Sequence, residues 1–202
     1  GVIETSSFYP KNYERTFAIS NLDQAISTTR EVVENSITSR LLSDVPVGSF
    51  LSGGLDSSIV ATVASRELSS LDTFTIEFED LDDPYHGKAN ESFAARETSK
   101  FIGSNHHNVP VTAQDFRSSL KDFVKYGDLP FSVSSGLGIM AISKAARNKD
   151  IKVLLTGDGA DECFGGYSWY KNLLSKKVYP KINDLDEDIT FQSIGINETE
   201  RT

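Results

Sequence analysis

Apolar residues along the chain occur in short continuous runs, separated by longer stretches in which they recur at helical spacing. Four short runs, mostly of β-branched, aliphatic or aromatic residues, predict strands at residues 45–51, 73–78, 106–111 and 151–155. Helical spacing and capping residues predict helices at residues 21–42, 57–68, 90–103, 112–126, 138–147 and about 161–171. The run at 151–155 is almost entirely apolar, which is typical of a strand buried on both faces.

The alternation of strands with helices determines the expected fold class. It predicts an α/β domain with a doubly wound, mainly parallel sheet, right-handed crossovers and helices on both faces. Ligands of such sheets bind beyond the carboxyl ends of the strands. We assign residues 21–174 to this domain, residues 1–20 to a linker or arm, and residues 175–202 to a C-terminal arm or a truncated helical region.

The most distinctive segment follows the first strand run and has the sequence Ser-Gly-Gly-Leu-Asp-Ser-Ser at residues 52–58. Its position before an apolar stretch predicts a tight turn into a helix start, where unpaired N–H groups and the helix dipole favour phosphate. The two glycines allow close approach of the backbone, and the serines offer hydroxyl donors. Asp56 is compatible with a phosphate if Mg²⁺ lies between them. The segment therefore predicts a polyphosphate site.

Other phosphate-binding turns differ from this segment. It lacks the Gly-Lys-[Ser/Thr] end of a Walker A loop and the three spaced glycines of a dinucleotide-binding turn. A serine-rich turn without any ligand stays open as the alternative interpretation.

A second glycine-rich segment follows the last strand run and has the sequence Thr-Gly-Asp-Gly-Ala-Asp-Glu-Cys-Phe-Gly-Gly-Tyr at residues 156–167. It contains three carboxylates within five residues, Asp158, Asp161 and Glu162. Like charges placed this close raise at least one pKa unless a cation lies among them. Capping of the following helix by Asp161 or Glu162 is the structural alternative, and for Glu162 it stays open.

Composition narrows the possible partners and the compartment. The chain has 202 residues with 20 Lys and Arg against 29 Asp and Glu, a net charge of −9, which disfavours nucleic acid as a partner. The single cysteine, Cys163, excludes an internal disulfide and fits a reducing cytoplasm, and we expect it to be a buried packing residue. No apolar run reaches membrane-spanning length, so we expect a cytoplasmic protein without membrane contact. The histidines at 106 and 107 are expected to serve packing and surface roles.

The two glycine-rich segments together resemble the synthetase domain of the asparagine synthetase family, in the ATP pyrophosphatase (PP-loop) superfamily. The segments Ser-Asp-Val-Pro-Val-Gly at 43–48 and Asn-Glu-Ser at 90–92 add to the resemblance, which extends over about residues 21–170. It implies a five-stranded sheet of the adenine nucleotide alpha hydrolase-like fold. It also implies that the domain binds MgATP and adenylates the side-chain carboxylate of aspartate. Attack by ammonia would then give asparagine, AMP and pyrophosphate.

The resemblance also implies roles for individual residues. Backbone groups of the first and second strand ends would lie near adenine, the serine-rich turn would hold the pyrophosphate, and the second turn would lie near the ribose and the α-phosphate. The residues implied to bind ATP are Leu51, Ser52, Gly53, Gly54, Asp56, Ser57, Ser58, Ile76, Thr156 and Gly157.

The carboxylates of the two turns have further implied roles. Asp56 and Asp161 match the residues that hold Mg²⁺ in the family. Asp158 matches an acidic residue that guides or deprotonates the incoming amine, a step that a nearby carboxylate can perform.

The chain departs from the family pattern in three places. Relatives carry an N-terminal glutaminase domain that this chain has no room for, so we expect ammonia to come from solution or from a glutaminase domain or subunit. A later helical region that supplies a catalytic lysine is not matched, and Val133 stands where relatives often have Asp. A β-lactam-forming or peptide-cyclising ligase and a catalytically incomplete MgATP-binding module therefore stay open as alternatives.

Overall fold

The computed structural model describes residues 21–79, 91–127, 135–167 and 170. The strands are β1 (Val47–Phe50), β2 (Asp72–Phe78), β3 (Asn105–Val111) and β4 (Val153–Leu155). The helices are α1 (Leu22–Arg40), α2 (Leu55–Glu67), α3 (Ser92–Ile102), α4 (Ala113–Gly127), α5 (Ser135–Arg147) and α6 (Ala160–Phe164). The predicted arms at 1–20 and 175–202, the position of Val133, and Trp169 lie outside the described residues.

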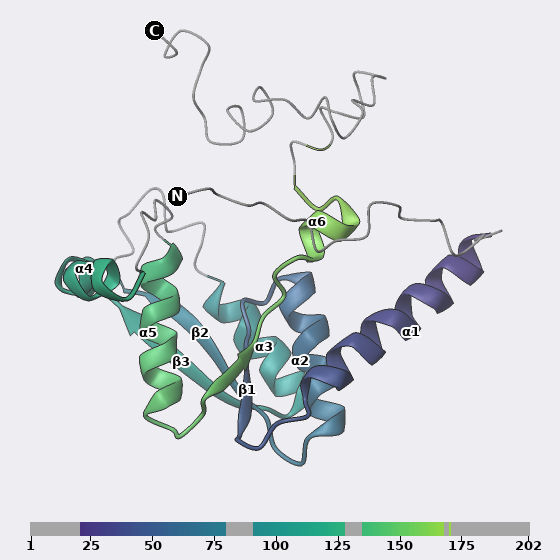
Figure 1. The fold of residues 1–202 in the computed structure, drawn as a ribbon, viewed down its shortest axis with the longest axis horizontal. Helices are drawn as coiled ribbons and strands as arrows, with labels where there is room; N and C mark the ends of the chain where they lie inside the picture. Colours follow the sequence, from purple (N-terminus) through teal and green to yellow (C-terminus); the bar gives the residue numbers. More distant parts are fainter. Residues whose placement is uncertain (1–20, 80–90, 128–134, 168–169, 171–202) are drawn as a thin grey trace, which may run out of the picture.

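The four strands form one parallel sheet in the order β3-β2-β1-β4 (Figure 1). In β1, Ser49 lies opposite Thr73 of β2 on one side and Leu155 of β4 on the other. The predicted α/β class and the parallel, doubly wound arrangement are confirmed. The expected count of five strands is corrected to four within the described residues, because the sequence offers only four strand-like runs and the fifth came from the resemblance.

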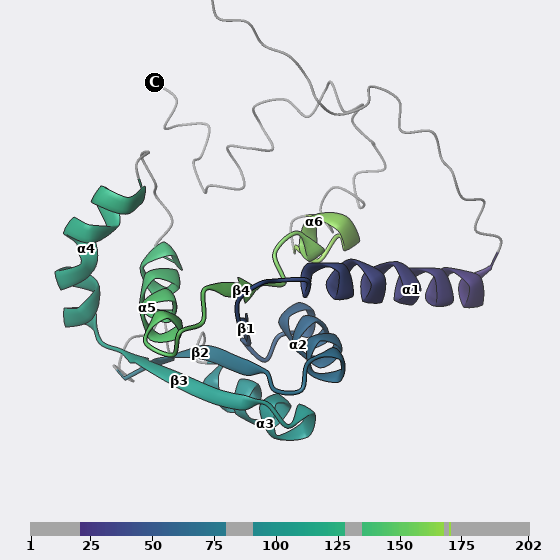
Figure 2. The same ribbon diagram turned by 60° about the horizontal axis from the view of Figure 1, so that its bottom comes forward.

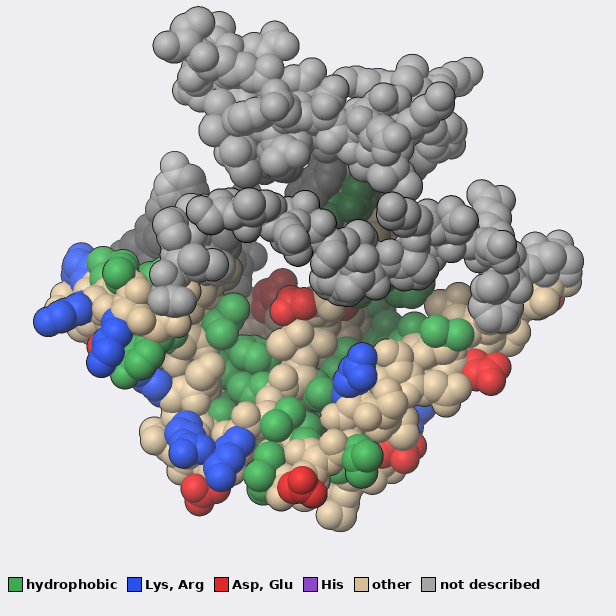
Figure 3. Space-filling view, viewed as in Figure 1, with side chains coloured by type: hydrophobic (Ala, Val, Ile, Leu, Met, Phe, Trp, Pro, Cys, Tyr) green, Lys and Arg blue, Asp and Glu red, His purple; other side chains and the backbone are tan. Residues whose placement is uncertain are grey.

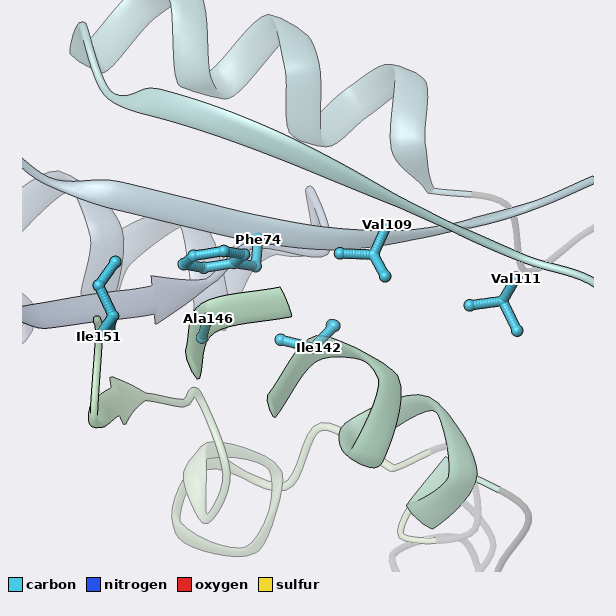
Figure 4. Close-up of a cluster of buried hydrophobic side chains, with 6 residues drawn as sticks. All are labelled: Phe74, Val109, Val111, Ile142, Ala146 and Ile151. Carbon is cyan, nitrogen blue, oxygen red and sulfur yellow. The ribbon is translucent and has the colours of Figure 1, made fainter. Parts of the chain in front are cut away.

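Helices cover both faces of the sheet, with α2 and α3 on one face and α5 on the other (Figures 1 and 2). On the α5 face, Phe74 is fully buried beside Val109, Val111, Ile142, Ala146 and Ile151 (Figure 4). On the other face, the buried cluster consists of Leu51, Ala61, Ala64, Leu71 and Ala95. Leu51, just after β1, and Phe74, within β2, are therefore fixed by packing on opposite faces of the sheet.

Local capping explains several helix boundaries. Asn21 caps α1, its Oδ1 accepting a hydrogen bond from the Gln24 N–H at 2.8 Å. Thr112 and Asp115 form a reciprocal pair at the start of α4, and the hydrogen bonds from Thr112 hold the pKa of the Asp115 carboxyl below its usual range. Gly103 ends α3 in the left-handed conformation, as the sequence predicts.

Further details of the sequence prediction are wrong. Helix α2 begins at Leu55, two residues before the predicted start, because Gly54 serves as its N-cap. Helix α6 ends at Phe164, before the predicted end near residue 171, because Gly165 follows it in the left-handed conformation.

The strand β4 is only partly buried, although its apolar run indicates burial on both faces. The reason is its place at the end of the sheet, where β1 is its only strand neighbour among the described residues. The helix α5 begins at Ser135, three residues before the predicted Gly138, so its first turn lies closer to the sheet edge than expected.

The order of the strands reverses direction between β1 and β4, and such a place is called a switch point. From β1 the chain moves to β2 and β3, and it then returns past β1 to β4 on the other side. The carboxyl ends of β1 and β4 lie on either side of this switch point, where ligands of open α/β sheets bind. Both glycine-rich segments begin there. Within the described residues, no helix is both long and apolar enough to cross a membrane.

Candidate functional site

The turn between β1 and α2 is held by a serine pair. Ser57 Oγ lies 2.9 Å from Ser52 Oγ and accepts a hydrogen bond from the Ser52 N–H at 3.1 Å. Ser52 Oγ in turn accepts a hydrogen bond from the Gly54 N–H at 3.2 Å. Because Ser57 is buried, these hydrogen bonds are shielded from water and hold the turn in a compact conformation.

The first turn of α2 presents free polar groups to this edge. Its N-cap is Gly54, which has no side chain, and no side-chain hydrogen bond caps the helix. The first bond of the helical ladder runs from the Ser58 N–H to the Gly54 carbonyl at 3.1 Å. The N–H groups of Leu55, Asp56 and Ser57 precede that bond, so they lack a carbonyl acceptor within the helix and are suited to bind an anion.

Gly53 packs the turn directly against α3. Its φ is +80°, and a Cβ at this position would lie 2.6 Å from Ala94 Cβ and 2.7 Å from the Ala95 nitrogen. Both the backbone conformation and the close approach therefore require glycine. As a result the serine-rich turn has almost no freedom to move away from the first turn of α3.

The second glycine-rich segment reaches the same place from β4. A Cβ on Gly157 would lie 2.9 Å from both Asp56 Cβ and the Ser57 nitrogen, so the backbone of this turn touches the first turn of α2. The Asp158 N–H donates to Thr156 Oγ1 at 3.3 Å, which helps to shape the turn. The structure thus brings together Asp56, Ser57, Thr156 and Gly157.

A cavity of about 620 Å³ opens beside this contact, and we call it the switch cavity. Helices α1 and α2 and the turn after β4 form its walls. Asp56, Thr156, Gly157 and Asp158 line it. Ser58 instead lines a separate hollow between α1 and α2.

A second, smaller cavity of about 210 Å³ lies between the ends of β1 and β2 and the first turns of α5, and we call it the edge slot. Leu51 and Ile76, which the resemblance predicts near adenine, line it together with Ser52, which the resemblance predicts at the pyrophosphate. Sequence reasoning missed its other lining residues, Phe50, Phe74, Thr75, Phe78, Glu91, Ser135, Ile139 and Ile142. Most of these residues lie in predicted strands or in the predicted helix at 138–147, but a sequence pattern does not record which of these elements face one another.

The hydrogen-bond parity of the sheet directs the backbone of Ile76 toward the edge slot. The Leu51 N–H donates to the Phe74 carbonyl at 2.9 Å, so the polar groups of Phe74 face β1. Backbone groups alternate sides along a strand, so those of Ile76 face the same side, beyond the last residue of β1. A donor and an acceptor are thus directed to the place predicted for the edge of an adenine ring.

In the part of the chain that the structure describes, the carboxylates of the two turns form no ion pair with a basic side chain. No ion pair between described residues includes Asp56, Asp158 or Asp161. On the face shown in Figure 3, basic side chains gather over α4 and the far end of α5, and acidic ones lie near the turn after β4. Arg40, in the last turn of α1, is a basic residue that lines the switch cavity.

Asp161 is seated by the glycines that follow α6. Gly165 and Gly166 donate their N–H groups to the Asp161 carbonyl, at 2.8 and 3.1 Å. A Cβ on Gly166 would overlap Asp161 Oδ1, so the glycine leaves the space that this carboxylate occupies. Asp161 is not among the residues that line the switch cavity, and its pairing with Asp56 stays a prediction.

Glu162 differs from its neighbours because it has a partner within the chain. The Tyr167 hydroxyl donates to Glu162 Oε1 at 2.7 Å. This bond lowers the pKa of the Glu162 carboxyl and raises the pKa of Tyr167 to about 12. Glu162 therefore stabilises the local turn through Tyr167, and not by capping α6, because among the described residues no side-chain hydrogen bond caps that helix.

The remaining candidates lie outside the chemistry of the edge. His106 bonds Thr73 Oγ1 through Nδ1 at 3.0 Å, and its pKa is lowered mainly by burial. His107 Nε2 lies 2.6 Å from Asp72 Oδ1, at the opposite ends of the strands from the site.

The prediction of a buried Cys163 is wrong, because its side chain is exposed at the rim of the switch cavity. Its position in a helix of five residues leaves too little surrounding structure to cover it. Within the described residues, no group of three or more His, Cys, Asp and Glu could hold a metal ion.

The fold and the two touching turns define a doubly wound, parallel α/β domain with a ligand edge at its switch point. The chain belongs to the asparagine synthase family, whose profile matches residues 28–195. The family prediction is thereby confirmed.

Known relatives show how far the likeness extends. The chain is 34% identical over 160 residues to "Asparagine synthetase [glutamine-hydrolyzing] 1" of Bacillus subtilis (strain 168), covering 79% of this chain and 24% of that protein. It is 30% identical over 184 residues to "Amidase chry2" of Gibberella zeae, covering 83% of this chain and 27% of that protein. The chain spans about a quarter of the length of these curated relatives.

Among solved structures, the NMN synthetase of Francisella tularensis matches 70% of this chain and 58% of its own chain, with a TM-score of 0.47 and 14% identity.

Proposed function

We propose that this chain is the nucleotide-activating domain of an ATP-dependent amide-forming ligase. In this reaction the side-chain carboxylate of aspartate attacks the α-phosphorus of ATP, which releases pyrophosphate and gives β-aspartyl-AMP. Ammonia then displaces AMP and asparagine forms. The observation that carries the proposal is the contact between Gly157 and the first turn of α2, because it joins the two family motifs at one ligand edge.

The β1–α2 turn is suited to hold the pyrophosphate of ATP. The N–H groups at the start of α2 point toward an anion, and the hydroxyls of Ser52 and Ser57 can exchange their mutual bond for phosphate oxygens. Gly53 lets the turn pack closely on α3, and Gly54 leaves the N-terminus of α2 without a side chain. Ser58 would contribute from the α1 side of the helix.

The edge slot is suited to hold the adenine ring. Leu51 closes the slot at the end of β1, and Ile76 offers its backbone donor and acceptor at the end of β2. The α5 wall is apolar and would cover one face of the ring. Thr156 and Gly157, across the switch point, would then lie near the ribose and the α-phosphate.

The donor set fits Mg²⁺, with Asp56 and Asp161 as the residues that would hold it. Mg²⁺ commonly takes one or two carboxylates and completes its coordination with phosphate oxygens and water. Among the described residues, Asp56 and Asp161 form no ion pair with a basic side chain and belong to no group of three or more possible metal ligands. Two such carboxylates match the small number of protein ligands that Mg²⁺ commonly takes. When bound, the ion would neutralise the charge of the pyrophosphate leaving group.

Asp158 is proposed to act on the amine step. Its side chain is exposed at the switch cavity, next to the turn that would hold the α-phosphate. A carboxylate in that place can accept a proton from ammonium or from the attacking amine. Ammonia would come from solution or from a glutaminase domain or subunit of the whole protein.

A second candidate keeps the adenylation chemistry and changes the acceptor. One relative with 30% identity is named an amidase, so members of similar identity do not all carry the same name. The alternative acceptor is a different carboxylate, as in β-lactam-forming or peptide-cyclising ligases.

Exchange of labelled pyrophosphate into ATP tests the function, measured on the full-length protein that contains this chain. We expect exchange that depends on both aspartate and Mg²⁺, with Asp56→Asn lowering it at least about 100-fold. Exchange with another carboxylate, and none with aspartate, supports the second candidate. Tight MgATP binding without exchange for any carboxylate refutes both ligases and leaves a binding module. Comparing ammonium salts with glutamine identifies the amine source.

A further inference from the structure

A glycine in the interior of α5 has no place in the chemistry described so far. Gly138 is buried in the second turn of the helix, and its backbone has no left-handed φ. Glycine destabilises a helix interior relative to alanine, so a helical backbone alone does not account for it. A Cβ added at this position would overlap Cδ1 of Ile76, which already fills that space.

The methyl group that fills this space belongs to a residue of the edge slot. Ile76 lines the slot and also packs on the hydrophobic cluster beneath α5. On the core side, Val111 and Ala146 of this cluster are each 2% exposed, so that side is filled. Among the described residues, the slot is therefore the open space that a displaced Ile76 side chain can enter.

The size of the slot makes such a displacement consequential. The cavity measures about 210 Å³, and its α5 wall is formed by Ile139 and Ile142. Moving one methyl group inward narrows the gap between β2 and α5 where a flat ring would insert. The backbone groups of Ile76 that face the slot would be obstructed by the same movement.

We propose that Gly138 is a positioning residue for the nucleotide base. Its missing side chain seats Ile76 beneath α5 and keeps the edge slot wide enough for a purine ring. The inference rests on the proposed function and adds to it the wall that determines which base fits. Gly138 itself touches neither the base nor the reacting atoms.

A methyl-exchange experiment tests the proposal on the full-length protein. The variants are Gly138→Ala, Ile76→Val and the double variant, which moves one methyl group from β2 to α5 at nearly constant volume. The control is Gly127→Ala at the end of α4, where a Cβ would meet open space. Calorimetry measures the dissociation constants of MgATP and of magnesium pyrophosphate, which probes the phosphate site without the base.

We expect Gly138→Ala to weaken MgATP binding about tenfold and pyrophosphate binding less than about twofold. The double variant should return to within about threefold of Ile76→Val, and Gly127→Ala should match the wild type. If Gly138 had only a structural role, Gly138→Ala would weaken the binding of both ligands to the same extent, and shortening Ile76 would not restore MgATP binding.

Three results would overturn the proposal. They are unchanged MgATP binding in Gly138→Ala, equal weakening for both ligands, and no recovery in the double variant. If Gly138→Ala fails to fold, the double variant against Ile76→Val still decides, since its packed volume is preserved. A wild-type protein that binds neither ligand refutes the proposed function itself, whereas a normal wild type with an unaffected Gly138→Ala refutes only this inference.

Discussion

The two turns that meet at the sheet edge are held in opposite ways. The β1–α2 turn is closed by buried serine bonds and packed against α3, with Leu51 only 1% exposed before it. The β4–α6 turn is largely exposed, and its carboxylates at 158 and 161 have no basic partner among the described residues. The first turn is therefore preorganised before any ligand arrives. The second turn instead has exposed negative charges that no described basic side chain balances, so a bound cation would balance them.

The largest effect is expected from Gly53→Ala in the preorganised turn. The positive φ and the clash with Ala94 should lower the free energy of unfolding by about 2–4 kcal/mol. Urea unfolding followed by circular dichroism measures the change. The control is Gly103→Ala, which has a φ of +70° but open space, and should cost only about 1 kcal/mol. Equal costs would show that the packing on α3 is unimportant.

Ser57→Ala removes the centre of the serine network in the same turn. The half-buried Ser52 N–H loses its acceptor and the Ser52 hydroxyl loses one of its partners, so we expect a loss of about 1–2 kcal/mol in the free energy of unfolding. Ser65→Ala is the matched control, because Ser65 Oγ bonds only the carbonyl of Thr62 within its own helix. That change should cost under about 0.5 kcal/mol. Similar losses for both serines would contradict a preorganised turn.

Gly166→Ala tests whether the second turn depends on a cation. The added Cβ would displace the Asp161 carboxylate, so the Mg²⁺ concentration for half-maximal pyrophosphate exchange should rise about tenfold. The free energy of unfolding should change by less than about 1 kcal/mol, since the site is exposed. Glu162→Gln in the same turn should leave the Mg²⁺ requirement within about twofold. A larger shift for Glu162→Gln than for Gly166→Ala would reverse the assignment of the metal ligand.

The smallest effect is expected from Tyr167→Phe, which removes the bond to Glu162. The lowered pKa of Glu162 means that its contribution to stability is present above its ordinary pKa of 4.5 and is lost as pH falls through the folded value. The raised pKa of Tyr167, about 12, means that its contribution is present below pH 10.0 and is lost as pH rises through about 12.

Thermal unfolding of the wild type and Tyr167→Phe should therefore differ slightly between these limits and converge outside them. A difference titration of tyrosinate absorbance assigns the residue that ionises near pH 12. Ionisation of Tyr167 near its ordinary pKa would show that the hydrogen bond is absent in solution.

The sequence alone predicted the fold class, the helix boundaries at Asn21, Gly103 and Thr112, and the convergence of the two turns. These features depend on local signals, such as Asn21 before an apolar stretch and the glycines at 53 and 157 after strand runs. The parallel order then brings distant turns together without further information.

What the sequence could not predict depends on neighbours that no local pattern records. The partial exposure of β4 follows from its place beside a single strand. The α5 wall of the edge slot was missed because the sequence predicts the helix that contains Ile139 and Ile142 but not the strands on which that helix packs. The purpose of Gly138 emerges only when Ile76 is found in the place of its Cβ. Cys163 has a residue type that favours burial, yet its short helix leaves it exposed.

The pairing of β1 with β4 also has a consequence for how the site comes into being. Ser49 and Leu155, which lie opposite each other in these strands, are 106 residues apart in the chain. Contacts that close long loops carry a large entropic cost and tend to form late in folding. We therefore expect the β1–α2 turn to be shaped while the ribosome is still making α5, whereas the completed edge awaits the docking of β4. Nucleotide binding would then become possible only after residue 155 has been synthesised and β4 has docked on β1. Bound nucleotide would in turn stabilise the docked β4.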